Sequence, residues 1–267
     1  CIYSGFVTHE RFKPKRHFFR YRTFSLFIDL AEVKDLENLL LPSDSNLSTS
    51  IGDFFNSLQE IAAAPDDQAP RIIAVEKGKD LAGQFNLYSD RIESLKKKII
   101  DKSKNSVTSI NLLSAQINSI NGKLLASSSG SGANALLDQR DILIDQLSEV
   151  SQITVYYGSK GEAEIRLGNT GSGPIIVEAD ASSSKGNNST TNIDVIVQGS
   201  RLQTVVGITK TATNQVQAGI LAGLVDSYAL ANDTMNEVDA LAVMISKKFN
   251  EINMSGINLD GKNGKQM

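Results

Sequence analysis

Tryptophan is absent from this sequence, and cysteine, histidine and proline are scarce. Of 267 residues, one is Cys, two are His and five are Pro. A single cysteine, Cys1, excludes an intrachain disulfide framework and a zinc site built from several cysteines. Both histidines, His9 and His17, lie near the amino terminus. The chain beyond His17 therefore offers no Ser-His-Asp triad, no thiolate nucleophile and no histidine metal site.

Charge and hydropathy exclude further classes of protein. The 27 basic and 30 acidic residues give a net charge of −3, which is too balanced for a globally basic nucleic-acid binder. No apolar run approaches the roughly 20 residues that span a bilayer, so we expect no membrane insertion. No signal peptide is recognisable, and a chain that begins with Cys1 is expected to be a fragment. Apolar residues make up 40% of the sequence, enough to bury a core.

Aromatic residues are concentrated at the amino-terminal end. Six Tyr and ten Phe make 16 aromatics, and eight of them lie in the first 27 residues beside many basic side chains. Residues 17–30 predict a strand, 3–12 its hairpin partner and 31–40 a helix. The basic and aromatic mixture also fits a nucleic-acid-binding hypothesis, but a hairpin with one packed face gives the same pattern and is favoured. The polar stretch 42–50 predicts a linker, so residues 1–41 are expected to be a head of different origin.

Helical periodicity dominates the remainder of the chain. Residues 51–65 predict a short helix with Ser50 as its N-cap. Residues 71–125 predict a helix of roughly 80 Å if it is continuous. The heptad phase changes across 100–109, which predicts a stutter, a bend or a solvated turn there. Residues 214–253 predict another long helix.

Apolar residues recur along these helices at alternating steps of three and four, the pattern of a coiled-coil seam. A further helix is expected to be capped by Asn134, with Leu136, Leu143, Leu147 and Arg140 on its seam. The other residues expected to pack in helix seams are Leu81, Phe85, Ile92, Leu95, Ile99, Leu113, Ile117, Leu224, Tyr228, Val238, Ile245 and Phe249.

Between the helices the period changes to two, which predicts strands joined by glycine-rich turns. The five predicted strands are 153–157, 162–167, 174–179, 193–197 and 202–207. Residues 180–192 are polar and are expected to form a surface loop.

The predicted fold class is mainly α. It comprises an elongated bundle of long heptad-patterned helices with a small antiparallel β insert, plus an unrelated β-hairpin-and-helix head. The expected domains are a head at 1–41, a linker at 42–50, a helical domain at 51–150, a β domain at 151–207 and a continued helical domain at 208–267.

No segment carries a convincing catalytic or ligand-binding motif. Asp138, Asp141 and Asp145 share one face of a predicted helix and are interpreted as a solvated stripe. Residues 256–264 have some features of a calcium loop, but Lys262 stands where an oxygen ligand belongs. We therefore expect no catalytic residue, no metal site and no cofactor. Long helices expose lateral surface rather than a pocket, which favours a role in assembly.

Several segments resemble the flagellar hook-associated protein 1 family, the subunits of the bacterial hook–filament junction. The resemblance covers roughly residues 44–267, and its segments are 53–71, 110–124, 136–155, 218–242 and 249–264. Its most specific element is the sequence LLDQRD, formed by Leu136, Leu137, Asp138, Gln139, Arg140 and Asp141.

The resemblance implies a structural subunit without enzymatic activity. Such a subunit is exported through the flagellar type III apparatus and assembles outside the cell. The implied partners are copies of itself, the neighbouring hook and other hook-associated subunits, and an export chaperone, with no nucleic acid among them. In this family the two chain ends form an inner coiled-coil layer. Neither end is matched here, so polymerisation of this chain is expected to be impaired.

A second resemblance supports an alternative function. Residues 1–41 resemble the start of an uncharacterised bacterial family encoded beside cyclopropane-fatty-acid synthases. The matching residues are Tyr3, Gly5, Val7, His9, Arg11, Pro14, His17, Phe19 and Tyr21. The alternative is a truncated lipid-associated enzyme with His9 and His17 as its acid–base groups.

Overall fold

The computed structural model describes residues 34–38, 46–126, 131–179, 190–257 and 261–265. The expected hairpin of the head, most of the 180–192 loop and both histidines lie outside these residues.

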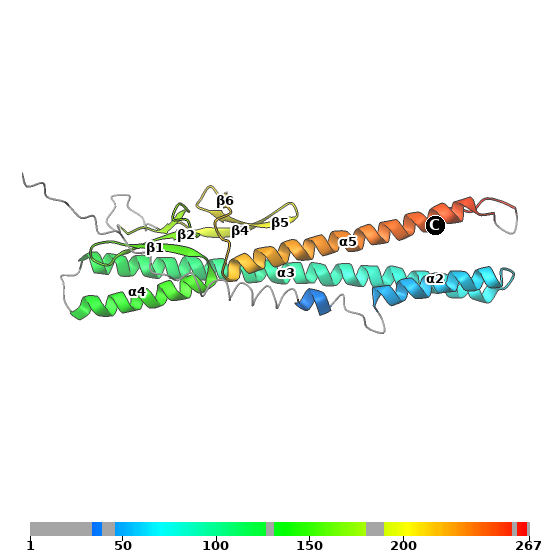
Figure 1. The fold of residues 1–267 in the computed structure, drawn as a ribbon, viewed down its shortest axis with the longest axis horizontal. Coiled ribbons are helices and arrows are strands. Elements are labelled where there is room, and N and C mark those ends of the chain that lie inside the picture. Colours follow the sequence, from blue (N-terminus) through cyan, green and yellow to red (C-terminus); the bar gives the residue numbers. More distant parts are fainter. Residues whose placement is uncertain (1–33, 39–45, 127–130, 180–189, 258–260, 266–267) are drawn as a thin grey trace, which may run out of the picture. The chain divides into compact units, whose positions relative to one another are not determined.

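The described chain is mainly helical, and the predicted fold class of long helices with a small antiparallel β insert is confirmed (Figure 1). A helical turn at 34–38 agrees with the helix predicted for 31–40. The elements that follow are α2 (Leu47–Ala63), α3 (Gln68–Ala126), α4 (Ser131–Val150), β1 (Ile153–Tyr157), β2 (Ala163–Leu167), β3 (Ile175–Val177), β4 (Ile193–Gln198), β5 (Arg201–Val206), β6 (Thr211–Thr213) and α5 (Ile220–Ser255).

The described residues divide into two compact units. The first unit comprises 100–226, which includes the second half of α3, all of α4 and all six strands. The second unit comprises 34–99 and 227–265, which includes α2, the first half of α3 and most of α5. This division differs from the ranges expected from composition, because α3 and α5 each contribute residues to both units.

Helix α2 begins at Leu47, four residues before the start at residue 51 that the sequence predicts. Its N-cap is Asn46, whose Oδ1 accepts a hydrogen bond from the backbone N–H of Thr49 at 2.7 Å. The predicted cap, Ser50, lies inside the helix, and that prediction is wrong. Asparagine is as strong an N-cap as serine, and burial of Leu47 favours the earlier start.

Helix α3 is continuous over 59 residues. It begins at Gln68, so Pro70 lies in its first turn, where the missing N–H costs nothing. Of the three alternatives for 100–109, the structure shows the stutter. The buried positions Ile99, Ser103, Val107 and Ile110 follow one another at steps of four, four and three without a break in the helix.

The buried seam positions differ from expectation at several residues. Ser114 and Asn121 are buried on α3, whereas Leu113 is half-buried. On α4 the expected Leu147 is buried, whereas the expected Leu143 is half-buried and its neighbour Ile144 is buried instead. On α3 hydrophobicity favoured Leu113 over its polar neighbour Ser114, whereas on α4 Leu143 and Ile144 are both apolar and hydrophobicity does not distinguish them.

Helix α4 begins at Ser131, so Asn134 lies within it and is not its cap. The β insert consists of two antiparallel sheets, ordered β1-β2-β3 and β4-β5-β6. Each predicted strand corresponds to one of β1 to β5. Strand β6 is missing from the prediction, because Thr211–Thr213 is only three residues long and its one apolar residue is alanine, too little for a recognisable alternation. Its presence and the turn at Gly219 place the start of α5 at Ile220 rather than at residue 214.

Candidate assembly surfaces

The predicted seam residues divide into a buried and a half-buried group. Leu81, Ile92, Ile99, Ile117, Leu224, Tyr228 and Val238 are buried. Phe85, Leu95, Leu113, Ile245 and Phe249 are half-buried. Burial along α5 therefore decreases toward its carboxyl end, since the positions after Val238 are no longer fully covered. Apolar side chains on this part of α5 remain accessible to another protein surface.

An aromatic cluster lies in the second unit, where α2 meets α5. The ring centroids of Phe54 and Phe55 are 5.6 Å apart, and those of Phe54 and Phe249 are 5.5 Å apart, both with tilted planes. Tilted aromatic pairs at this separation are stabilising beyond their buried area. The ion pair of Lys77 with Asp53, at 2.8 Å, joins α3 to α2 beside the cluster.

The aromatic cluster forms part of an apolar groove lined by α2, α3 and α5, which is called the groove below. Its volume is about 840 Å³. Val75 on α3 and Ile252 on α5 leave 54% and 69% of their surface exposed there. The lining residues are Phe54, Phe55, Leu58, Ile61, Arg71, Ala74, Val75, Gly78, Lys79, Ala82, Lys248, Phe249, Ile252 and Asn253. Continuous exposed apolar surfaces are typical of sites that bind proteins, membranes or ligands.

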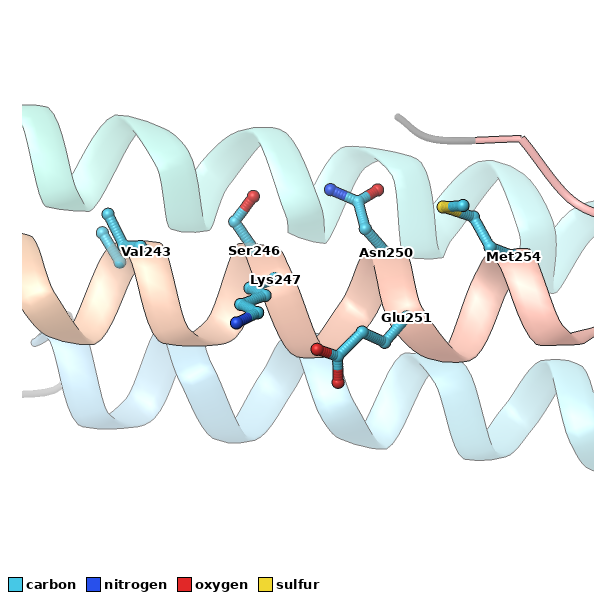
Figure 2. Close-up of a pocket in the computed structure, with 7 residues that line it drawn as sticks. Val243, Ser246, Lys247, Asn250, Glu251 and Met254 are labelled. Carbon is cyan, nitrogen blue, oxygen red and sulfur yellow. The ribbon is translucent and has the colours of Figure 1, made fainter.

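A second accessible surface lies on α5 alone (Figure 2). Val243, Ser246, Asn250 and Met254 follow one another along the helix, with Lys247 and Glu251 beside them. These spacings of three and four residues place the first four side chains on one helix face. Every residue that lines this surface belongs to α5.

The LLDQRD motif lies on α4 in the first unit. Leu136 and Leu137 are half-buried there, Asp138 and Gln139 are exposed, and Asp141 is partly covered. Only Arg140 is buried, with 5% of its surface exposed. The periodicity of the sequence predicts that Arg140 lies on the helix seam, but it does not predict which residues Arg140 contacts.

Arg140 connects α4 to the turn between β1 and β2. Its Nη1 donates a hydrogen bond to the backbone oxygen of Gly161. Its Nη2 and Nε donate to Asp141 Oδ1 at 2.7 and 3.1 Å. The guanidinium also lies 4.5 Å from the ring centroid of Tyr157 on β1, a cation–π contact. A fixed planar donor group of this kind positions a helix against a hairpin as a lysine cannot.

Burial raises the pKa of the Tyr157 phenol above its ordinary value, with Asp141 raising it further and Arg140 opposing the shift. The folded state therefore favours the neutral phenol. This contribution to stability is complete below the unfolded pKa of about 10 and is lost as pH rises through the folded value. We expect an alkaline absorbance titration of the chain minus that of Tyr157→Phe to show one phenol ionising above pH 10. A difference curve centred at or below that value would contradict the expected burial.

The three aspartates expected to share one face of α4 differ in their exposure. Asp138 is exposed, whereas Asp141 and Asp145 are partly covered and Asp141 pairs with Arg140, so the three carboxylates are not equally solvated. Within the described residues, no His, Cys, Asp and Glu side chains gather in a group that could hold a metal ion. None of the helices searched there is both long and apolar enough to cross a membrane.

Sequence reasoning placed Phe249 in a helix seam but missed the residues of α2 and α3 that make the groove with it. Phe54, Phe55 and Val75 were not singled out, because each fits an ordinary amphipathic helix. The available signal was the pair of adjacent aromatics on α2, since neighbouring helical residues point about 100° apart and a single packing face rarely covers both.

Residues 33–267 match the family model described as the flagellar hook-associated protein FlgK helical domain. This chain belongs to that family. The match begins at residue 33, within the stretch expected to be an unrelated head. The comparisons give no support to the resemblance between residues 1–41 and a family encoded beside cyclopropane-fatty-acid synthases, or to the alternative of a lipid-associated enzyme.

Two curated relatives carry the name flagellar hook-associated protein 1. The protein of Bacillus subtilis (strain 168) is 25% identical over 241 residues, which is 83% of this chain and 48% of that protein. The protein of Escherichia coli (strain K12) is 27% identical over 240 residues, 87% of this chain and 43% of that protein. This chain of the FlgK family therefore spans less than half the length of these relatives.

A solved structure has the same fold. It is the flagellar hook junction protein FlgK from Burkholderia pseudomallei, with a TM-score of 0.77 and 22% sequence identity. The superposition covers 91% of this chain and 44% of that one. The arrangement of helices and β insert is therefore that of the FlgK family.

Proposed function

We propose that this chain is the helical part of a structural subunit at the hook–filament junction of the extracellular bacterial flagellum. It acts by packing its exposed helix faces against neighbouring protein and catalyses no reaction. Family membership and the names of the curated relatives support this function.

The groove is the observation that carries the proposal. Its apolar side chains come from α2, α3 and α5. The side chains of Val75 and Ile252 are more than half exposed. Burying an apolar side chain of this size stabilises a complex by about 1.5–3 kcal/mol when coverage is complete. An occupant that covered Phe55 as well would bury a compact centre of the kind that dominates protein–protein binding energy.

The proposed partners are copies of this chain, neighbouring hook and hook-associated subunits, and an export chaperone before assembly. Arg71, Lys79 and Lys248 line the groove beside its apolar residues. Acidic residues flanking the apolar face of a partner would complement these side chains.

Charged substitutions in the groove test this function. We expect the fold to tolerate Val75→Lys and Ile252→Lys, because both positions are exposed and a lysine can extend its amine into water. We expect the double variant to lose association that the unsubstituted chain shows with itself or with purified flagellar hooks. Self-association is measured by sedimentation velocity over a concentration series. Binding to hooks is measured by co-sedimentation.

The matched control is Leu112→Lys, since Leu112 is an equally exposed apolar residue of α3 that does not line the groove. Circular dichroism should show the same helix content in all three proteins. The proposal fails if the unsubstituted chain binds neither itself nor hooks, or if the groove variant and the control bind equally well.

A further inference from the structure

Two asparagines of α3 contact the two sheets of the first unit. Asn121 contacts Ala163, the first residue of β2, and Asn111 contacts Ile193, the first residue of β4. They are ten residues apart, which is about 15 Å along the helix and about 80° around its axis. Each sheet therefore meets α3 through one side-chain amide.

Asn121 is completely buried, with 0% of its surface exposed. Its Oδ1 accepts from the backbone N–H of Ala163 at 2.9 Å. Its Nδ2 donates to the backbone oxygens of Ala163 at 2.8 Å and Glu178 at 3.1 Å. The reverse amide orientation would set N–H against N–H and oxygen against oxygen, so these partners fix it.

These bonds replace a missing part of the first sheet. A residue in an antiparallel ladder can exchange both of its backbone hydrogen bonds with one opposite residue. The pairing of β2 with β3 extends only to Ile165 opposite Val177, where β3 ends. Ala163 lies beyond that point, and the amide of Asn121 makes the two bonds that a longer β3 would have made.

Asn111 makes the same exchange at the second sheet. Its Oδ1 accepts from the backbone N–H of Ile193 at 2.9 Å, and its Nδ2 donates to the oxygen of Ile193 at 2.9 Å. Strand β4 lies at one edge of its sheet. The amide therefore closes the first position of an edge that could otherwise pair with another chain.

We propose that Asn111 and Asn121 are docking residues, each acting as the missing strand residue of one sheet, so that α3 anchors the two sheets separately. Apart from contacts of Thr190 and Thr191 with β3, each sheet has its own ladder. Loss of one amide therefore releases one sheet while the other stays docked.

Leucine substitutions in the full chain test this inference. Leucine keeps the side-chain volume and removes the hydrogen bonds. The readout is hydrogen exchange, measured by NMR, of one bonded backbone N–H in each sheet. These are Leu167, which donates to Pro174 in the first sheet, and Gly207, which donates to Asn192 in the second.

In Asn121→Leu we expect exchange at Leu167 to accelerate about tenfold or more, because local opening then frees the sheet. Exchange at Gly207 should stay within about twofold. Asn111→Leu should give the reverse result. Gln116→Leu, which changes an exposed amide of α3, is the control and should alter neither.

A second variant separates hydrogen bonding from simple filling of space. Asn121→Asp carries an acceptor but no donor when ionised, and it regains a donor when protonated. We expect its Leu167 protection to return as pH is lowered, whereas the unsubstituted chain shows no such recovery. Lys123, Glu162 and Glu178 are titratable residues close in sequence to Asn121 or to its hydrogen-bond partners. Both proteins contain them, so their effect on the pH dependence cancels in the comparison.

The inference is overturned if either leucine variant loses protection in both sheets together, or if neither changes the exchange of its own sheet. It is also overturned if the aspartate variant responds to pH as the unsubstituted chain does. If Asn121→Leu does not fold, the aspartate titration and Asn111→Leu decide the matter.

Discussion

Gly219→Ala is expected to lower the free energy of unfolding by about 3 kcal/mol or more. Gly219 precedes α5 with a φ of +93°, a left-handed conformation that L-residues adopt at a cost of about 1–2 kcal/mol. A β-carbon added there would lie 2.8 Å from the backbone oxygen of Val150 and 2.9 Å from the backbone of Ser151. Backbone atoms at the end of α4 cannot rotate away as a flexible side chain can.

The close approach at Gly219 has a structural purpose. Gln152 donates its backbone N–H to the oxygen of Ala218 at 3.0 Å, which brings the segment before β1 against the start of α5. A side chain at 219 would push these two segments apart and break that bond. The cost therefore combines backbone strain with lost packing of the first unit.

Urea unfolding followed by circular dichroism measures this effect. The matched control is Gly83→Ala, since Gly83 lies in the exposed interior of α3 with nothing within 4 Å of a new β-carbon. Alanine should raise stability there by about 0.5–1 kcal/mol, because it restricts the unfolded chain and favours the helix. Equal effects at the two glycines would show that the conformation at Gly219 is not required.

Arg140→Met is expected to cost about 2–3 kcal/mol of unfolding free energy. Methionine fills the space of the aliphatic stem but leaves the oxygen of Gly161 without its donor and removes the cation from the ring of Tyr157. The loss stays below that of a fully buried ion pair, because the Asp141 side chain is 41% exposed and water can solvate its charge.

Two further variants test the role of the guanidinium. Arg140→Lys keeps the charge but not the planar set of donors, so we expect it to recover only about half of the lost stability. Arg91→Met changes an exposed arginine of α3 and should stay within about 0.5 kcal/mol of the unsubstituted chain. If Arg140→Met is as stable as Arg91→Met, Arg140 does not hold α4 to the β1–β2 turn.

The sequence alone predicted the helices and most of the strands, because periodicity is a local property. Steps of three and four along 71–125 and 214–253 correspond to α3 and α5, and alternation corresponds to β1 through β5. The LLDQRD motif identified the family on which the comparisons agree. The phase change at 100–109 predicted a stutter as one of three alternatives, since hydrophobic spacing records how a helix face rotates.

Only the tertiary structure decided which side chains those elements bring together. Asn121 is a polar residue at a buried position, and no local pattern indicates that a strand ends where its amide is needed. Arg140 was recognised as part of a motif, but its bond to Gly161 depends on how a distant hairpin folds. Likewise, the groove requires side chains from α2, α3 and α5 to meet. Periodicity specifies the face of an element, whereas the partner of that face is set by contacts between residues far apart in the chain.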